Sequence, residues 1–147
     1  MNKILISISD FYKDISKILL DSAVFILKKN NIAYEQVIVP GAFELASSIN
    51  MGLETYEYNG VIALGCVIKS KTLHYDMIVT ECARAIQDIA IYYSVPLGFG
   101  LLIVDNKKQA LNRAEEYGKN AANACIQMTK VKEQFMICND KRASRFN

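Results

Sequence analysis

The 147-residue chain has no tryptophan, two prolines and a single histidine, His74. Hydrolysis by a Ser-His-Asp triad is disfavoured, because no serine and aspartate accompany this histidine in a matching motif. The four cysteines form no CxxC pair, so a zinc site would need ligands from scattered positions, and we expect no metal. Three of the four cysteines instead lie in apolar segments. We expect these three to be small hydrophobic residues of the core.

Long apolar runs and a strong charge of one sign are also missing. No stretch approaches the roughly 18 apolar residues of a membrane-spanning helix, and the apolar run at the N-terminus is too short for a secretory signal. A net charge of +2 is too small to indicate nucleic-acid or membrane-surface binding. We therefore expect a cytoplasmic protein with neither nucleic acid nor membrane as a partner.

Hydrophobic residues are what the chain has in quantity, at 52% against 22% charged residues. This balance favours a packed core over disorder. The length fits a single domain over residues 1–147, with 130–147 forming the end of a last helix and a tail.

Short β-branched segments alternate with segments of helical periodicity along the whole chain. Strands are expected at 3–9, 34–40, 60–68 and 97–105, and helices at 14–30, 42–55, 72–94 and 106–135, the last interrupted near Tyr117 and Gly118. Regular alternation with buried strands predicts an α/β fold, namely a flavodoxin-like three-layer α/β/α sandwich around a four-stranded parallel sheet.

The expected sheet also indicates where a ligand would bind. Ligands of such sheets bind beyond the carboxyl ends of the strands, which selects the loops 9–13, 39–44, 67–74 and 104–107. The only histidine, His74, falls in the third of these loops.

Loop 67–74 combines lysines and hydroxyls at the start of a helix, in the sequence VIKSKTLH. Backbone N–H groups at a helix N-terminus favour anions, so a phosphate or carboxylate site is one interpretation. A capping role for Thr72 with solvated lysines is the equally open alternative. The P-loop pattern GxxxxGK[ST] and the dinucleotide pattern GxGxxG are both absent, which disfavours nucleotides.

The other loops offer an aromatic ring, a glycine and a carboxylate. Phe11 could stack on a planar ligand or serve as a hydrophobic staple. Gly41 permits a tight turn or the close approach of a ligand. Glu44 could accept hydrogen bonds from a polyol or amide, or only stabilise the helix dipole. One acid/base, aromatic surface and anion-binding cations suit condensation or isomerisation of a phosphorylated small molecule.

Four segments in this order resemble one enzyme family: ISDFYKDISKILLDSA, VPGAFELA, ALGCVIKSKTLHYD and VPLGFGLLIVDNKKQALNRA. The chain resembles the 6,7-dimethyl-8-ribityllumazine synthases of riboflavin biosynthesis from about residue 3 to about residue 128. The resemblance implies condensation of 5-amino-6-(ribitylamino)pyrimidinedione with 3,4-dihydroxy-2-butanone 4-phosphate, with release of phosphate and water. It implies imine formation, phosphate elimination and ring closure without a redox or metal cofactor.

The resemblance also implies roles for residues of the first two loops. Phe11 matches the aromatic that stacks on the pyrimidine ring. Gly41, Ala42 and Glu44 match the turn and helix start that hold the ribityl chain and the ring edge. The position of Ala42 is often serine in relatives, so alanine loses a hydroxyl there.

The third loop matches the reacting end of the family's site. Val67 and Ile68 match the strand end whose backbone binds the pyrimidine, and His74 matches the residue that transfers protons.

Phosphate binding in this family involves two subunits. Ser70, Lys71 and Thr72 match the phosphate loop. Arg113 matches an arginine that binds the phosphate across a subunit interface, and Phe99 matches an aromatic contributed by the neighbouring subunit. The implied active site therefore lies between subunits of a homo-oligomer.

The chain departs from the family at several positions. Relatives usually have glycine at the position of Ser70. A serine there would be strained if the backbone needs a positive φ. At the position of Lys71, relatives have a small or acidic residue. The lysine of this chain could instead strengthen anion binding. The segment after Arg113 is about four residues shorter, so the family's lysine falls on Tyr117, and Lys119 is a possible substitute.

The same deletion bears on assembly, because this segment is associated with packing pentamers into a hollow shell. We therefore expect a free homopentamer, with a decamer as the alternative. Two other functions remain open: a lumazine-binding or structural homologue that has lost catalysis, and a relative that makes riboflavin by lumazine dismutation. The pair GAFEL and LHYD argues against the last.

Overall fold

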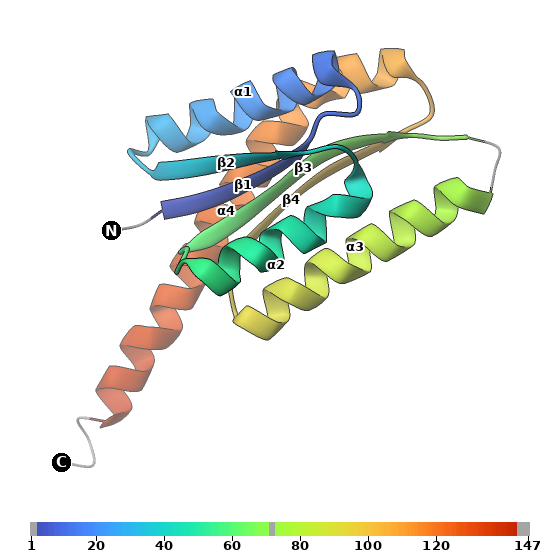
Figure 1. Cartoon of the computed structure of the whole chain (residues 1–147). Helices are drawn as coiled ribbons and strands as arrows, with labels where there is room; N and C mark the ends of the chain where they lie inside the picture. The colour runs from blue at the N-terminus through green and yellow to red at the C-terminus, as the bar shows by residue number, and fades with distance from the viewer. Residues whose placement is uncertain (1–2, 71–72, 144–147) are drawn as a thin grey trace.

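The computed structural model describes residues 3–70 and 73–143, without the side chains of 73, 142 and 143. Four parallel strands form one sheet in the order β2-β1-β3-β4 (Figure 1). The strands are β1 (Lys3–Ser9), β2 (Ala33–Val39), β3 (Gly60–Ile68) and β4 (Leu97–Val104). The helices are α1 (Lys13–Lys29), the 3₁₀ turn η1 (Ala42–Glu44), α2 (Leu45–Thr55), α3 (Leu73–Tyr93) and α4 (Lys107–Ala143).

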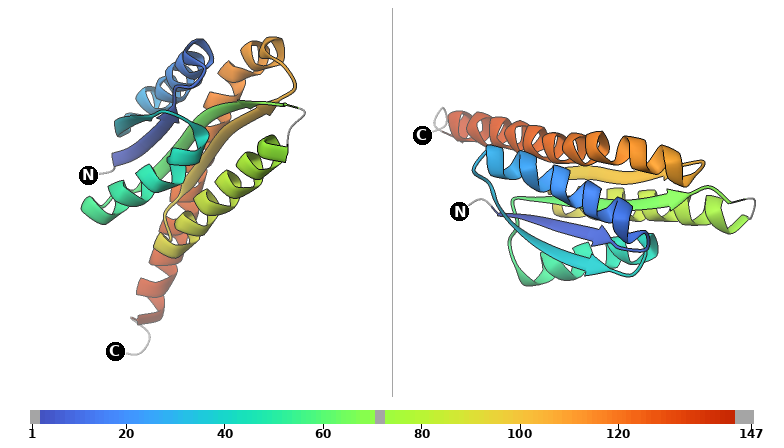
Figure 2. Two further views of the ribbon diagram at one scale, coloured as in Figure 1. Left: turned by 45° about the vertical axis from the view of Figure 1, so that its right-hand side comes forward. Right: turned by 90° about the horizontal axis from the view of Figure 1, so that it is seen from above.

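Helices cover both faces of the sheet, with α1 and α4 on one face and α2 and α3 on the other (Figures 1 and 2). Each face has its own core, because buried residues of the central strands point alternately to the two sides. Ile6 and Ile62 pack toward α1 and α4, whereas Leu5 and Val61 pack toward α2 and α3. The predicted three-layer α/β/α sandwich is confirmed.

Helix α4 is continuous, so the predicted interruption near Tyr117 and Gly118 is wrong. The glycine serves helix packing. A Cβ at position 118 would lie 2.0 Å from Ser22 Oγ and 2.4 Å from the Leu19 carbonyl oxygen of α1. Glycine therefore lets α4 and α1 approach closely, a tertiary reason that local helix propensity does not contain.

Three of the four cysteines are core residues, as predicted. Cys66, Cys82 and Cys125 are buried, and Cys138 on α4 is exposed. Burial raises the pKa of the Cys125 thiol to about 12, so this group remains protonated at neutral pH.

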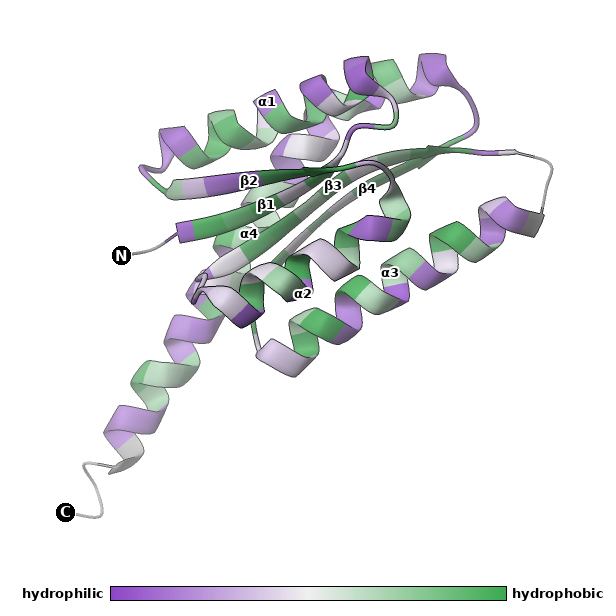
Figure 3. Cartoon of the chain, in the orientation of Figure 1, coloured by the Kyte–Doolittle hydropathy of each residue, from purple (hydrophilic) through white to green (hydrophobic). Residues whose placement is uncertain are grey.

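Hydropathy is mixed along every helix (Figure 3). Among the helices that the structure describes, none is both long and apolar enough to span a bilayer.

Candidate active site

A cleft of about 490 Å³ lies at the carboxyl ends of β1, β2 and β3. The chain leaves β1 toward β2 and leaves β3 toward β4, so the neighbouring ends of β1 and β3 form the topological switch point where such folds bind ligands. The cleft is lined by Phe11, Tyr12, Gly41, Ala42, Phe43, Glu44, Cys66, Val67, Ile68, Ser70, His74, Tyr75 and Ile78. Three of the four predicted loops therefore contribute to one cleft.

Exposed aromatic rings flank the cleft. Phe11 is 69% exposed, and its ring packs edge-on against Tyr12 with 5.0 Å between the ring centroids. Phe43, for which the sequence predicted no role, is 51% exposed and also lines the cleft. Large apolar rings left open to solvent at a cleft provide stacking surface for a planar ligand.

Glu44 and Gly41 lie against each other at the start of η1. Gly41 has extended backbone angles, φ −154° and ψ 174°, so no tight turn requires glycine. A Cβ at this position would lie 3.1 Å from Glu44 Oε2, so the missing side chain leaves room for the carboxylate. The Glu44 backbone N–H donates to the Gly41 carbonyl at 3.2 Å, which fixes this short turn.

The first turns of α3 form the opposite wall. His74 is exposed, Tyr75 is half-buried, and Ile78 follows His74 by one helical turn. Burial, reinforced by the charges of Asp76 and Asp105, raises the pKa of the Tyr75 hydroxyl. The phenol therefore remains a hydrogen-bond donor at neutral pH.

Cys66 lies at the floor of the cleft but is not a candidate nucleophile. Burial, with a smaller contribution from the Asp14 carboxylate, raises its thiol pKa to about 11. Because thiolate is the nucleophilic form, this thiol is inert near neutral pH.

Two predicted site residues lie outside the cleft. Phe99 lines a separate groove between α3, β4 and α4, and Arg113 is exposed on α4. Loop 104–107 contributes no lining residue to the cleft. Lys71 and Thr72 lie outside the described residues.

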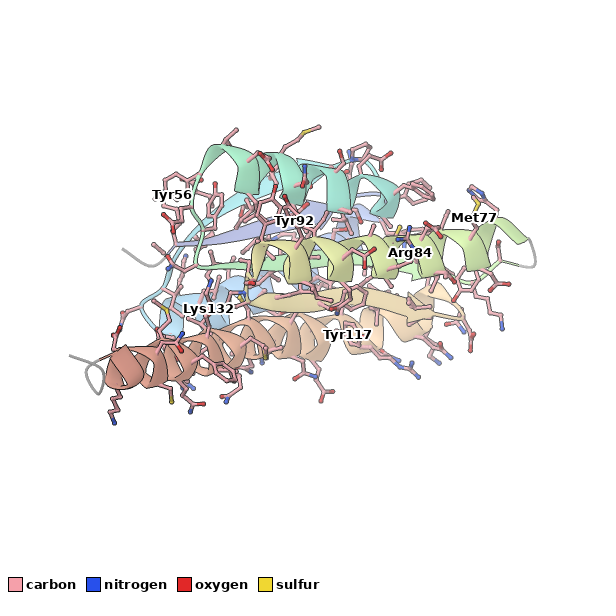
Figure 4. The ribbon with its side chains drawn as sticks, turned by 90° about the horizontal axis from the view of Figure 1, so that it is seen from below. Tyr56, Met77, Arg84, Tyr92, Tyr117 and Lys132 are labelled. Atoms are coloured by element: carbon pink, nitrogen blue, oxygen red, sulfur yellow. The ribbon has the colours of Figure 1, made fainter. Side chains whose placement is uncertain are left out.

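The residues that depart from the family pattern in the phosphate region lie in different surroundings. Ser70 lines the cleft and does not have a positive φ, so its backbone is not strained in that way. Lys119 donates to Glu115 at 3.0 Å and lies 5.7 Å from the ring centroid of Phe25 on α1. Tyr117, four residues after Arg113, shares the face of Arg113 and is exposed (Figure 4). The geometry therefore directs Lys119 toward α1, away from this face.

Sequence reasoning overlooked Tyr12, Phe43, Cys66, Tyr75 and Ile78 as lining residues. Adjacency to predicted residues was the available signal for Phe43 and Tyr75, and helical spacing from His74 was the signal for Ile78. No group of three or more histidine, cysteine, aspartate or glutamate side chains is arranged for a metal ion among the described residues.

The family model for 6,7-dimethyl-8-ribityllumazine synthase matches residues 1–133. The chain belongs to the 6,7-dimethyl-8-ribityllumazine synthase family. It is thus a lumazine synthase by family, a transferase of riboflavin biosynthesis.

Curated relatives match over most of their length. The 6,7-dimethyl-8-ribityllumazine synthase of Bartonella bacilliformis is 37% identical over 131 residues, covering 85% of this chain and 86% of the relative. The 6,7-dimethyl-8-ribityllumazine synthase 1 of Rhizobium meliloti is 39% identical over 140 residues, covering 89% and 92%.

Among solved structures, a putative lipoprotein fragment from Peptoclostridium difficile 630 superposes with a TM-score of 0.51 at 14% identity. The superposition covers 89% of this chain and 99% of that one. At this identity the likeness concerns the fold alone.

Proposed function

We propose that the cleft at the β1/β3 switch point is where this lumazine synthase condenses the ribitylaminopyrimidinedione with 3,4-dihydroxy-2-butanone 4-phosphate. The observation that carries the proposal is the convergence of Phe11, Glu44 and His74, from three separate loops, on one cleft. These residues provide a stacking surface, a hydrogen-bond acceptor and a proton-transfer group within one volume.

The pyrimidine would stack on Phe11, with its edge held by backbone groups of Val67 and Ile68 at the end of β3. The ribityl chain would extend toward Gly41, Ala42 and Glu44, where the carboxylate accepts hydroxyl hydrogen bonds. The volume of about 490 Å³ falls within the range of small-molecule sites, and most of the lining is apolar or aromatic.

His74 would move protons during the condensation. The 5-amino group attacks the ketone carbon, and loss of water forms the imine. Removal of a proton from the adjacent carbon then supplies the electron pair that expels phosphate and leaves an enol. A proton added to the terminal carbon converts this enol to a ketone, and attack of the ribitylamino nitrogen on that carbonyl closes the ring and releases a second water. An imidazole suits this task, because it can both accept and donate protons near neutral pH.

Phosphate would be held by Ser70, Lys71 and Thr72 together with Arg113 of a neighbouring copy. Arg113 is exposed on α4 and does not line its own cleft. Arginine forms paired, charge-assisted hydrogen bonds with phosphate, and Phe99 of the neighbour would complete the aromatic lining.

Exposed apolar residues support a head-to-tail assembly. The edge strand β4 borders the groove that contains Phe99, whereas Ile38 on the other edge strand and Met51 on α2 are 58% and 65% exposed. Contact between unlike faces at opposite edges of a sheet is heterologous, and it gives a ring when the rotation between successive copies closes. We propose a cytoplasmic homopentamer, a ring in which continuous α4 lacks the family's segment between the last two helices.

The decisive experiment assays the purified chain with both substrates and follows the fluorescence of the lumazine product. His74→Ala is expected to lower kcat by about 10²-fold or more while the oligomer persists. Ser47→Ala, an exposed position on α2 outside the cleft lining, is the control. Binding of lumazine without any turnover by the unmodified protein would overturn the proposal.

A further inference from the structure

The last part of α4 continues past the family's matched region. The family model ends at residue 133, whereas the helix runs to Ala143 and projects beyond the rest of the molecule (Figures 1 and 2). Every described side chain from Lys132 to Lys141 is exposed. Most helical stability in proteins comes from the packing of an amphipathic face, so packing against a partner would stabilise this exposed end of α4.

This projecting segment has three consecutive large apolar side chains. Phe135, Met136 and Ile137 are 69%, 58% and 55% exposed. Single exposed apolar residues are ordinary, but three on one projecting turn leave considerable apolar surface in water.

Only one of the three residues belongs to a larger apolar surface. Met128, Val131 and Phe135 recur at spacings of three and four residues and line one wall of the groove that contains Phe99. We call these three residues the α4 stripe. Opposite the stripe, the groove is bounded by β4 and by α3, which lie beside α4 (Figure 4). The α3 side includes Ile91, which is 72% exposed.

The groove, of about 590 Å³, is held in shape at its end by one polar contact. Lys132 Nζ donates to the Ser94 carbonyl at 2.8 Å, which joins α4 to the end of α3 (Figure 4). An ammonium is favourably placed at the C-terminus of a helix.

We infer that the α4 stripe, together with the rest of α4 beyond residue 133, forms an additional contact with the neighbouring copy of this chain. This inference rests on the proposed ring, because the stripe is continuous with the groove face that would carry Phe99 to the neighbour's cleft. Since α4 runs back along β4, it passes the amino end of that strand near Lys132, which contacts Ser94, and its end projects further. The apolar side chains that a head-to-tail neighbour would offer are Met51 and Tyr56, in and just after the last turns of α2, which are 65% and 44% exposed.

Matched charge substitutions test the inference in the full chain. Phe135→Asp changes the stripe, whereas Ile137→Asp changes the opposite side of the same helix at similar exposure. Sedimentation velocity over a dilution series should show Phe135→Asp dissociating at an at least about tenfold higher concentration than the unmodified protein. Ile137→Asp should stay within about twofold, and far-UV circular dichroism checks that both variants are folded.

A native thiol gives a second readout that needs no substitution. Cys138 is exposed and follows Phe135 by three residues, so it continues the stripe. Its alkylation by iodoacetamide should be about tenfold slower in the ring than after dissociation by dilution, and fast at all concentrations in Phe135→Asp.

The outcomes separate this inference from the proposed function. The additional contact is overturned if the ring is stable and its dissociation is unchanged in both variants, or if Cys138 is alkylated equally fast in the ring and in the free subunit. Either result leaves the enzyme proposal intact. Equal weakening by both substitutions also overturns the assignment to the stripe. An unmodified protein that is active yet monomeric at micromolar concentration refutes the ring itself.

Discussion

At the residue scale, neighbouring positions in the cleft have different chemical tasks. Cys66 remains a thiol because burial raises its pKa, and Tyr75 remains a neutral hydrogen-bond donor for the same reason. In the proposed mechanism, proton transfer therefore falls to His74, and contacts with the substrate would be made by the rings and backbone around it.

Tyr117 offers a gain-of-function test of the phosphate site. It shares a helix face with Arg113, and the family resemblance implies that it stands where relatives have a lysine, so Tyr117→Lys would add a cation there. We expect KM for the phosphate substrate to fall about threefold to tenfold at nearly unchanged kcat. Lys119→Ala is the control, because that ammonium contacts Glu115 and Phe25, and a higher KM in the control would contradict this geometry.

Tyr58 predicts how stability changes at alkaline pH. Burial, and then the hydrogen bond that its hydroxyl donates to Glu35 at 2.5 Å, raise its pKa to about 12. The unfolded pKa is about 10, so the stabilisation is complete below pH 10 and is lost as the pH rises toward 12.

Urea unfolding between pH 9 and pH 11.5 should therefore show a steeper loss of stability in the unmodified protein than in Tyr58→Phe. Glu35→Gln should lower the Tyr58 pKa only partly, as ultraviolet titration can measure, because burial is the larger cause. Identical pH profiles for Tyr58→Phe and the unmodified protein would rule out this contribution.

At the element scale, the fold depends on the close contact between α1 and α4. Gly118→Ala would normally stabilise a helix by roughly 1 kcal/mol. Here the new methyl group meets Ser22 Oγ and the Leu19 backbone, so we expect a loss of about 1–3 kcal/mol in urea unfolding.

Gly52→Ala on α2 is the matched control. Its Cβ would approach Leu5 Cδ2 at 2.6 Å, the far end of a side chain that can move, so the cost should be smaller. A larger loss of stability for Gly52→Ala than for Gly118→Ala would contradict this prediction. It would mean that α1 and α4 move apart easily to make room for the methyl group.

At the scale of the whole molecule, the separation of the cleft from Phe99 and Arg113 predicts complementation between subunits. His74→Ala and Arg113→Ala subunits should each have low activity alone. Random mixing of equal amounts through an unfolding and refolding cycle should restore roughly a quarter of the sites, in which an intact cleft meets an intact arginine. Activity that never exceeds the average of the parents would exclude a shared site.

Local sequence patterns were sufficient to predict much of the fold and the position of the candidate site. Strand segments such as 60–68 are apolar over their whole length, and alternation with helical periodicity indicated the parallel sheet, its two helical layers and the loops that carry Phe11, Glu44 and His74. Short segment matches were sufficient for the family, because ordered motifs on a regular alternation are specific in combination.

The sequence by itself determined the alternation of elements, the core cysteines and the family, because these depend on nearest neighbours and periodicity. Only the tertiary structure decided that α4 is continuous, that Lys119 turns toward α1, and that Tyr12, Phe43 and Tyr75 line the cleft. Each of these depends on contacts between residues far apart in the chain. Gly118 shows the difference most directly, since the neighbours that require a glycine there belong to another helix.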